Sequence, residues 1–548
     1  MTSLKKIQDG KIRDNIIKII ARKKEIPVFA KSNEKMFTGK MKVFDFKGEK
    51  VGLYFPENIS GNKNIKQLHV NIRNKEGMIC FNTAINTNRK MEAYYLIKRP
   101  SKFYTSFRRK NIRCELDNEE VQLIIKNHAY TIKNISIDGC SFISKEMILP
   151  ANSKIRNAKI MAEDSNPIYI DGKIKNVRFY NGQYLYGVNF LKSDYQTYNN
   201  IFSLIFSKNY PSIKLLDDFS NQDIYDVFVK SGYISSYFEG REEECKEKFD
   251  FYFKAREKTK NKMQILFNIG YLKNEELLTI GSALKIYNNT YMGQHLVSIK
   301  KARFNIKSKI DIYAGISDFI LSRKDFKYYI SYFYADMHWH NEMFKRFSES
   351  LDDKKSIFDD FIFLEITTEN FKSAAMNFHK KYFVEPSDDI SPFVEYCRNN
   401  LSEIERKCYG YTKNEFNQDN IKQIYEVAGL YLNRILFKVS EKEKTVAYVV
   451  AEVYTSGLNI YNILDTARIL IVDKNAHIND IVKSASDEII AFYQKYNKKS
   501  FGFMCTNYKD GVESVDIEGV DHTVLFNRII GSRRGCLEYR QLLLSSIK

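Results

Sequence analysis

Two short clusters of polar residues suit the recognition of a compact anion that also presents hydrogen-bonding edges. The first is rich in arginine, Arg108-Arg109-Lys110-Asn111-Ile112-Arg113, and has the spacing R-x-x-x-R from Arg109 to Arg113. The second runs Asn134-Ile135-Ser136-Ile137-Asp138-Gly139. An arginine fork donates two hydrogen bonds to a guanine edge or to one phosphate, a fixed geometry that lysine lacks.

The second cluster adds small polar groups to the same chemistry. The Asn134 amide and the Ser136 hydroxyl donate and accept at short range, and both residue types bond back to their own backbone in turns. Gly139 is expected to turn the chain at positive φ and to leave room for a base. Either pattern alone also matches a basic surface or an ordinary β-turn, so the prediction depends on their order and spacing.

In that order and spacing the clusters resemble the two signatures of the PilZ domain, a small β-barrel that binds cyclic di-GMP. Alternating strands are expected over residues 153–161, 168–179 and 184–190, and the last, which ends in YGVNF, resembles the closing strand of PilZ domains. The resemblance implies six ligand-binding residues: Arg108, Arg109, Arg113, Asn134, Ser136 and Gly139. The arginines would grip guanine edges and phosphates, and the other three would shape the opposing wall.

The elements before these clusters resemble the barrel that precedes PilZ in flagellar-brake-type proteins. Short strands separated by turn residues are expected between residues 26 and 97. A helix is expected over residues 3–23. The predicted domains are therefore an N-terminal helix (1–24), a first β-barrel (25–97), and a PilZ barrel with its leading linker and a closing helix (98–210).

From residue 211 to 548, helical and strand patterns alternate. Helices are expected over 221–230, 240–258, 340–350, 418–432 and 478–496, and strands over 265–267, 361–366, 435–439, 445–454 and 468–472. The order from 433 to 505 resembles the core of GNAT-like acyltransferases, and 262–345 resembles a second such unit, which suggests units of about 211–380 and 381–548. The expected fold class is multidomain α+β: two N-terminal antiparallel β-barrels followed by a mixed α/β region, with a tandem GNAT-like pair as one arrangement.

One feature of GNAT enzymes, the loop that binds acyl-CoA, is missing from this sequence. GNAT enzymes hold the pyrophosphate of acyl-CoA on a glycine-bearing loop at a helix N-terminus, and residues 473–480 (DKNAHIND) contain no glycine. Either the acyl donor differs or the fold is catalytically silent, so no catalytic residue is assigned and acyl-CoA stays unsupported. The prediction is a cytoplasmic cyclic di-GMP receptor that passes its signal to residues 211–548; the alternative is an acyltransferase regulated by that messenger.

Charge and cysteine usage limit the partners. Residues 1–210 hold 38 lysines and arginines against 19 acidic residues, and the remainder holds 48 of each, so the net charge of +19 lies entirely in the first part. A basic field attracts a dianionic ligand, although nucleic acid or an anionic membrane surface also suits it. Eight scattered cysteines without a C-x-x-C pair indicate a reducing compartment. We expect no membrane-spanning helix, and a protein partner for the C-terminal region.

Other polar residues give no site. His338 and His340 would share one face of a strand and suit a metal, but no third ligand is evident, so no metal site is predicted. The carboxylates Asp359 and Asp360 are expected on a solvated acidic face.

Overall fold

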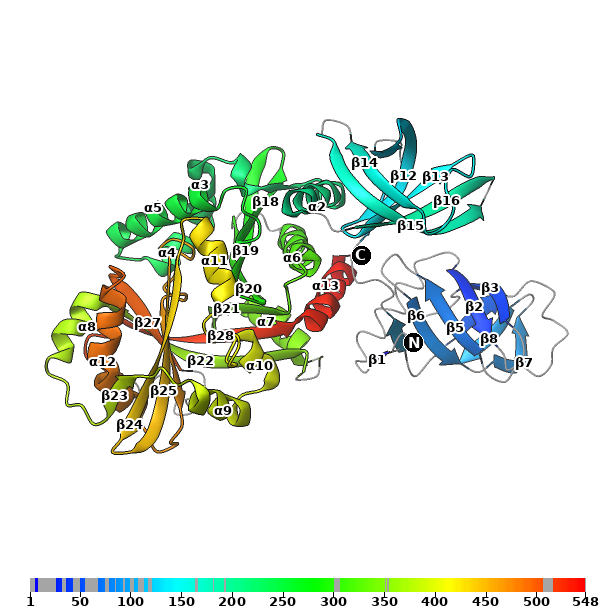
Figure 1. Cartoon of the computed structure of the whole chain (residues 1–548). Helices are drawn as coiled ribbons and strands as arrows, with labels where there is room; N and C mark the ends of the chain where they lie inside the picture. The colour runs from blue at the N-terminus through cyan, green and yellow to red at the C-terminus, as the bar shows by residue number, and fades with distance from the viewer. Residues whose placement is uncertain are drawn as a thin grey trace. The chain divides into compact units, whose positions relative to one another are not determined.

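In the computed structural model the chain forms two compact units, residues 1–193 and 194–547 (Figure 1). The described residues are 5–7, 26–31, 36–42, 50–54, 68–73, 78–83, 85–91, 94–98, 103–106, 113–116, 121–162, 166–180, 182–191, 194–299, 306–349, 351, 354–505 and 516–547. For the strands before residue 113, only the backbone is described.

The first sheet of the N-terminal unit is antiparallel at every pairing, in the order β1-β9-β6-β5-β2-β3-β4-β8-β7. Its strands are β1 (Lys5–Ile7), β2 (Ile26–Lys31), β3 (Met36–Lys42), β4 (Lys50–Tyr54), β5 (Leu68–Arg73), β6 (Met78–Thr83), β7 (Ile85–Met91), β8 (Tyr94–Lys98) and β9 (Phe103–Ser106). The expected run of short antiparallel strands is confirmed.

Two boundaries in this region were wrong. The predicted helix over residues 3–23 fails at its start, because Lys5–Ile7 forms β1 and pairs with Phe103–Thr105 of β9. The predicted boundary at residue 97 also fails, since β9 returns to the same sheet and pairs with β6. Pairing between distant segments decides both cases, and a local apolar period does not report it.

The second sheet is a closed barrel. Its strands are β10 (Arg113–Glu115), β11 (Val121–Ile125), β12 (His128–Ser136), β13 (Gly139–Ser144), β14 (Lys154–Ala162), β15 (Ile168–Tyr180) and β16 (Gln183–Phe190). The strands follow the order β12-β11-β14-β15-β16-β13, and a pairing between β12 and β13 closes the barrel. Strand β10 pairs with the C-terminal end of β12. The strands expected at 153–161, 168–179 and 184–190 are therefore confirmed.

Alternation of side chains fills the interior of this barrel. Leu123, Ile132, Ile160 and Ile174 are fully buried, and Phe142 stacks on Tyr186 with 4.8 Å between ring centroids. Since side chains of a strand point alternately inward and outward, the residues beside these apolar ones lie on the outer face.

The second unit is built on one twelve-stranded sheet, in the order β17-β18-β19-β20-β21-β28-β22-β27-β26-β25-β24-β23 (Figure 1). The strands are β17 (Ile213–Leu215), β18 (Leu266–Lys273), β19 (Glu276–Tyr287), β20 (Thr290–Ser298), β21 (Tyr328–Tyr334), β22 (Ser356–Thr367), β23 (Phe383–Pro386), β24 (Leu432–Glu441), β25 (Lys444–Tyr454), β26 (Thr466–Ile471), β27 (Ser500–Cys505) and β28 (His522–Ser532).

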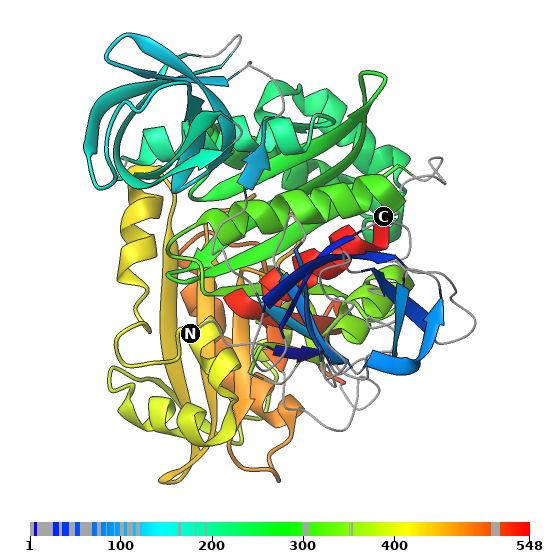
Figure 2. The same cartoon turned by 90° about the vertical axis from the view of Figure 1, so that its right-hand side faces the viewer.

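Helices flank this sheet. They are α2 (Tyr195–Asn209), η2 (Leu216–Asp218), α3 (Asn221–Lys230), α4 (Tyr233–Tyr237), α5 (Glu242–Thr259), α6 (Ile306–Ser322), α7 (His338–Glu349), α8 (Thr368–Ala375), α9 (Ser391–Asn400), α10 (Glu403–Cys408), α11 (Asp419–Val427), α12 (Ile478–Gln494) and α13 (Arg533–Ile547). Helices α6 and α13 lie side by side (Figures 1 and 2). The mixed α/β character expected of this region is confirmed.

The sheet contains the same arrangement twice. Strands β18, β19 and β20 form an antiparallel meander, and β21 follows helix α6 to pair parallel with β20. Strands β24, β25 and β26 repeat the meander, and β27 follows helix α12 to pair parallel with β26. The tandem repetition expected from the sequence is thus present in the topology.

The two repeats exchange strands, so the predicted division into units of about 211–380 and 381–548 is wrong. Strand β28, from the end of the chain, pairs with β21 of the first repeat. Strand β22, which follows the first repeat, pairs with β28 and with β27 of the second. The first repeat is thus extended by the strand that follows the second repeat, and the second repeat by the strand that follows the first. Residues 194–547 therefore form a single unit.

Helix α2 also belongs to this unit, not to the barrel, which corrects the predicted boundary at residue 210. Phe202 and Phe206 of α2 pack edge-on against Phe267. Tyr210, which caps the helix, donates to Asp318 of α6 at 2.7 Å. The apolar face of α2 therefore packs on the α/β region.

Candidate functional site

The two polar clusters of the sequence meet on the barrel. Strand β10 sets Arg113 opposite Ser136, in an antiparallel register that also sets Glu115 opposite Asn134. Arg113 Nη1 donates to Asn134 Oδ1 at 2.9 Å, so one residue of each cluster is in direct contact. Arg108 and Arg109 lie outside the described residues.

A tight hairpin holds the second cluster. Ser136 ends β12, Gly139 begins β13, and Ile137 and Asp138 form the turn between them. The Ser136 hydroxyl donates to the Gly139 carbonyl at 3.0 Å, and the Ser136 side chain is buried. The Ser136 side chain therefore bonds back to its own backbone as expected, and this hydrogen bond closes the hairpin.

Glycine is required at position 139 for a different reason from the one expected. Its φ is not positive, so the chain does not need glycine for a left-handed turn. Instead, a Cβ at Gly139 would lie 2.1 Å from the carbonyl oxygen of Val188 on β16. The glycine allows strands β13 and β16 to approach, and the space that we assigned to a ligand base is occupied by backbone.

Small residues continue this outer face across β13 and β16. Ser141 pairs with Gly187, and Gly139 pairs with Asn189, while the intervening Cys140 and Val188 point into the core. We call the face formed by Arg113, Asn134, Ser136, Gly139, Ser141, Gly187 and Asn189 the platform. Its two glycines allow close packing, since a Cβ at Gly187 would lie 2.7 Å from Asn176 Oδ1.

One atom of the platform has an unmet hydrogen-bonding capacity. The Ser141 hydroxyl is buried, and no partner for it exists among the residues that the structure describes. A buried polar atom without a partner costs about 1–3 kcal/mol, so it favours a ligand that supplies one. Burial also raises the pKa of the neighbouring Cys140 thiol to about 12, against the opposing influence of Arg113, so this cysteine acts as an apolar core residue.

The α/β region offers no comparable anion site where the acyltransferase resemblance requires one. Between β26 and α12, Asp473 forms an ion pair with Lys444, and hydrogen bonding to Lys444 lowers the pKa of its carboxyl. A carboxylate at this position disfavours a pyrophosphate. The segment between β26 and α12 therefore does not favour a pyrophosphate at the place where the acyltransferase resemblance requires one.

The remaining polar candidates have structural roles. His338 and His340 lie on α7, not on a strand, and burial lowers the pKa of His340 to about 4. Asp359 is half-buried and accepts from Arg528 Nε at 2.8 Å, whereas Asp360 is exposed as expected. Within the described residues, no group of three histidine, cysteine, aspartate or glutamate side chains is placed to hold a metal.

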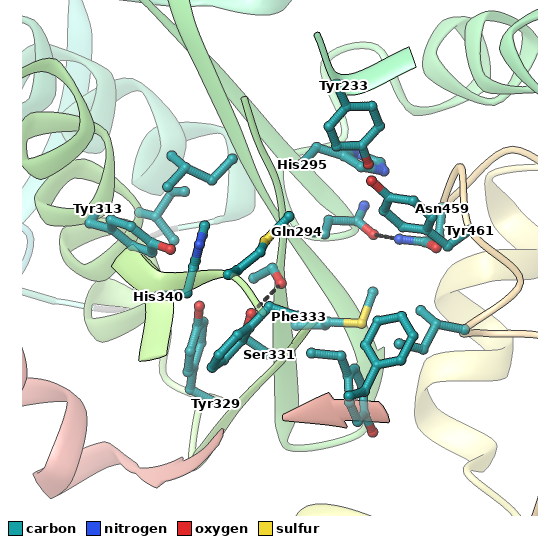
Figure 3. A pocket seen from close by; sticks show the side chains of 18 of the residues that line it. Tyr233, Gln294, His295, Tyr313, Tyr329, Ser331, Phe333, His340, Asn459 and Tyr461 are labelled. Carbon is teal, nitrogen blue, oxygen red and sulfur yellow. Dashed lines mark hydrogen bonds between the residues drawn. The ribbon is translucent and has the colours of Figure 1, made fainter. Parts of the chain in front are cut away.

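Sequence reasoning missed a pocket in the α/β region (Figure 3). It is a cavity of about 80 Å³ between β20, β21, α4, α6 and the segment before β26. Its polar residues include His295, Asn459 and Tyr461, which are far apart in the chain and form no motif. No pattern in the sequence signals them.

No family model and no curated protein matches the chain. Among solved structures, the complex of *K. pneumonia* MrkH with c-di-GMP is 18% identical over 37% of this chain and 96% of its own, with a TM-score of 0.29. The *Escherichia coli* YcgR complex with c-di-GMP is 11% identical over 37% of this chain and 92% of its own, with a TM-score of 0.30.

A third similar structure covers a larger share of the chain. A conserved protein of unknown function from *Enterococcus faecalis*, described as a probable N-acyltransferase, is 12% identical over 58% of this chain and 71% of its own, with a TM-score of 0.23. Across the described residues, no helix has the length and apolar character needed to cross a membrane.

Proposed function

We propose that the chain is a cyclic di-GMP receptor that binds the dinucleotide on the platform of its PilZ-type barrel and passes the signal to residues 194–547. The observation that carries the proposal is the hydrogen bond from Arg113 to Asn134. It joins the two clusters that the sequence separates, at the site where a PilZ domain would bind its ligand.

The chemistry of the platform supports this ligand. Arg113 is exposed, so a guanine edge or a phosphate can reach its guanidinium. The Ser141 hydroxyl, which has no partner among the described residues, can donate to or accept from a ligand. Arg108 and Arg109 would add further forks from the preceding segment, and the excess of basic residues in 1–210 attracts a dianion.

Calorimetric titration of the full chain with cyclic di-GMP tests the proposal. We expect Arg113→Ala and Arg109→Ala to abolish measurable binding, because a bidentate arginine contributes about 1–3 kcal/mol for each base or phosphate that it holds. Arg156→Ala is the matched control, since Arg156 is an exposed arginine on β14, a strand that pairs with neither β12 nor β13.

Ser141→Ala separates binding from folding. The variant removes a hydroxyl that has no partner among the described residues, so the barrel should unfold no more readily than before. Binding should nevertheless weaken severalfold, by about 1 kcal/mol. Unchanged affinity in the Arg109, Arg113 and Ser141 variants together would refute the platform as the binding site.

A further inference from the structure

The cavity of the α/β region opens where two parallel strands separate. Strands β20 and β21 pair from Thr290 with Tyr328 to Gly293 with Ser331. The residues that follow on each strand, Gln294 to Leu296 and Tyr332 to Phe333, line the cavity. Its approximately 80 Å³ corresponds to roughly five to eight water-sized spheres, which is enough for one small ring.

A distortion of β20 aims His295 into this cavity. The pairing of β20 with β19 shifts register between Val297 and Gln294, and His295 has a φ of 54°. A left-handed conformation is costly for a residue other than glycine, and such outliers persist where the surrounding structure holds them. The bulge turns the imidazole toward Tyr233 and Tyr461 (Figure 3).

Hydrogen bonding fixes the chemical form of this imidazole. His295 Nε2 accepts from the backbone N–H of Ile460 at 3.3 Å, and burial lowers the pKa of His295 to about 3. The ring is therefore neutral, and its proton lies on Nδ1. That N–H is a donor, its side chain is only 6% exposed, and it has no partner among the described residues.

Three more unmet polar atoms lie at the same end of the cavity. Asn459 donates to Gln294 Oε1 at 2.6 Å, and its own Oδ1 accepts no hydrogen bond from the described residues. The hydroxyls of Tyr233 and Tyr461 are buried and have no partner in the described part of the chain. Figure 3 shows these side chains gathered with His295 at one end of the pocket. The cavity thus offers one fixed donor, one fixed acceptor and two adaptable hydroxyls.

The walls exclude charge and favour a flat ligand. No lysine, arginine, aspartate or glutamate occurs among the described residues that line the cavity. Its second histidine, His340, also has a lowered pKa because of burial. Tyrosine and phenylalanine rings are among the residues that line the cavity, and they pack well against a planar group. A charged ligand would be desolvated here without a counter-charge.

We propose that this cavity binds an uncharged, single-ring compound with an amide or lactam edge, which presents an acceptor beside a donor. The edge meets His295 Nδ1 and Asn459 Oδ1, and the ring lies between the aromatic walls. This site is separate from the platform, and it does not depend on the binding of cyclic di-GMP.

Ligand-observed NMR on the full chain tests the inference with three uncharged probes: nicotinamide, uracil and 2-pyridone. We expect at least one to bind at about millimolar concentration, as suits so few atoms. Nicotinate has the same ring with a carboxylate in place of the carboxamide, and it should bind at least about tenfold more weakly. Failure of all three probes at about 10 mM, or equal binding of nicotinate and nicotinamide, would overturn the proposal.

Two tyrosine variants separate a binding role from a structural one. Tyr461→Phe removes a hydroxyl that makes no hydrogen bond with described residues, so we expect an unchanged or higher melting temperature together with at least threefold weaker probe binding. Tyr425→Phe is the matched control, because its buried hydroxyl donates to the Lys285 carbonyl at 2.6 Å and lies outside the cavity. It should lower the melting temperature and leave binding unchanged. Unaltered probe binding in Tyr461→Phe contradicts the proposed polar end.

Discussion

On the barrel, Arg113 lies exposed within the stretch of chain, residues 1–210, that carries the whole excess of positive charge. In the α/β region, by contrast, Glu452 is buried between Arg434 and Arg468. An exposed guanidinium is available to an anion arriving from solvent, whereas a buried pair is committed to the fold. This difference agrees with the two proposals, in which the barrel binds an anion and the α/β cavity binds an uncharged ligand.

The buried charges also join the two repeats of the large sheet. Tyr287 of β19 donates to Glu452 of β25 at 2.7 Å, and Arg434 of β24 donates to the same carboxylate at 2.7 Å. The guanidinium of Arg468 lies over the ring of Tyr409, 4.0 Å from its centroid. One carboxylate therefore holds groups from both repeats.

Neutralising Glu452 should cause the largest loss of stability, because its charge is buried. We expect Glu452→Gln to lower the free energy of unfolding by about 3–5 kcal/mol, because two buried arginines lose their counter-charge. Lys444→Ala, which breaks the exposed ion pair with Asp473, should cost only about 0–1 kcal/mol. Urea unfolding followed by tyrosine fluorescence measures both. Similar losses in the two variants would show that burial does not set the contribution of these pairs.

Salt should weaken ligand binding at the charged platform more than in the uncharged cavity. Raising NaCl from about 50 to 500 mM shortens the screening length severalfold, so the affinity for cyclic di-GMP should fall about tenfold. Binding of nicotinamide in the cavity should change by less than about twofold, since neither partner carries a charge. Calorimetry and NMR at the two salt concentrations give the comparison. A cavity that responds to salt as the platform does would mean that a charge reaches it.

His295 is also expected to make the stability of the chain depend on pH. Unfolded histidine takes up a proton near pH 6.5, whereas burial keeps the pKa of His295 at about 3 in the folded chain. The unfolded state binds more protons between these values, so the free energy of unfolding should fall as pH drops from 6.5 toward 3. His295→Asn, which tolerates the left-handed backbone, should flatten that part of the profile. Parallel profiles of variant and parent would exclude His295 as the cause.

Local signals predicted local elements well. Helix α3 begins directly after Ser220, where Ser220 and Asp223 form a capping box, and the predicted range 221–230 is the observed one. The contact between Arg113 and Asn134 agrees with two clusters that were recognised by spacing. These features could be predicted from the residue types, because the interactions join residues close in the chain or follow a known pattern.

Non-local packing could not be predicted in the same way. Gly139 is required by the backbone of Val188, a contact across strands that its own sequence neighbours do not reveal. Likewise, His295 enters the cavity through a bulge, and Asn459 and Tyr461, which line the same cavity, come from the second repeat. The pairing of β21 with β28 joins segments that are far apart in the chain, so only the folded sheet shows it.

The exchanged strands impose an order on folding during synthesis. Strand β21 ends at Tyr334, and its neighbour β28 begins only at His522. At roughly 5–20 residues per second, a ribosome needs about 10–40 s to make the intervening chain. During that time the edge of β21 is an open template for other strands. The nascent protein should therefore depend on chaperones that shield this edge until its last strand emerges.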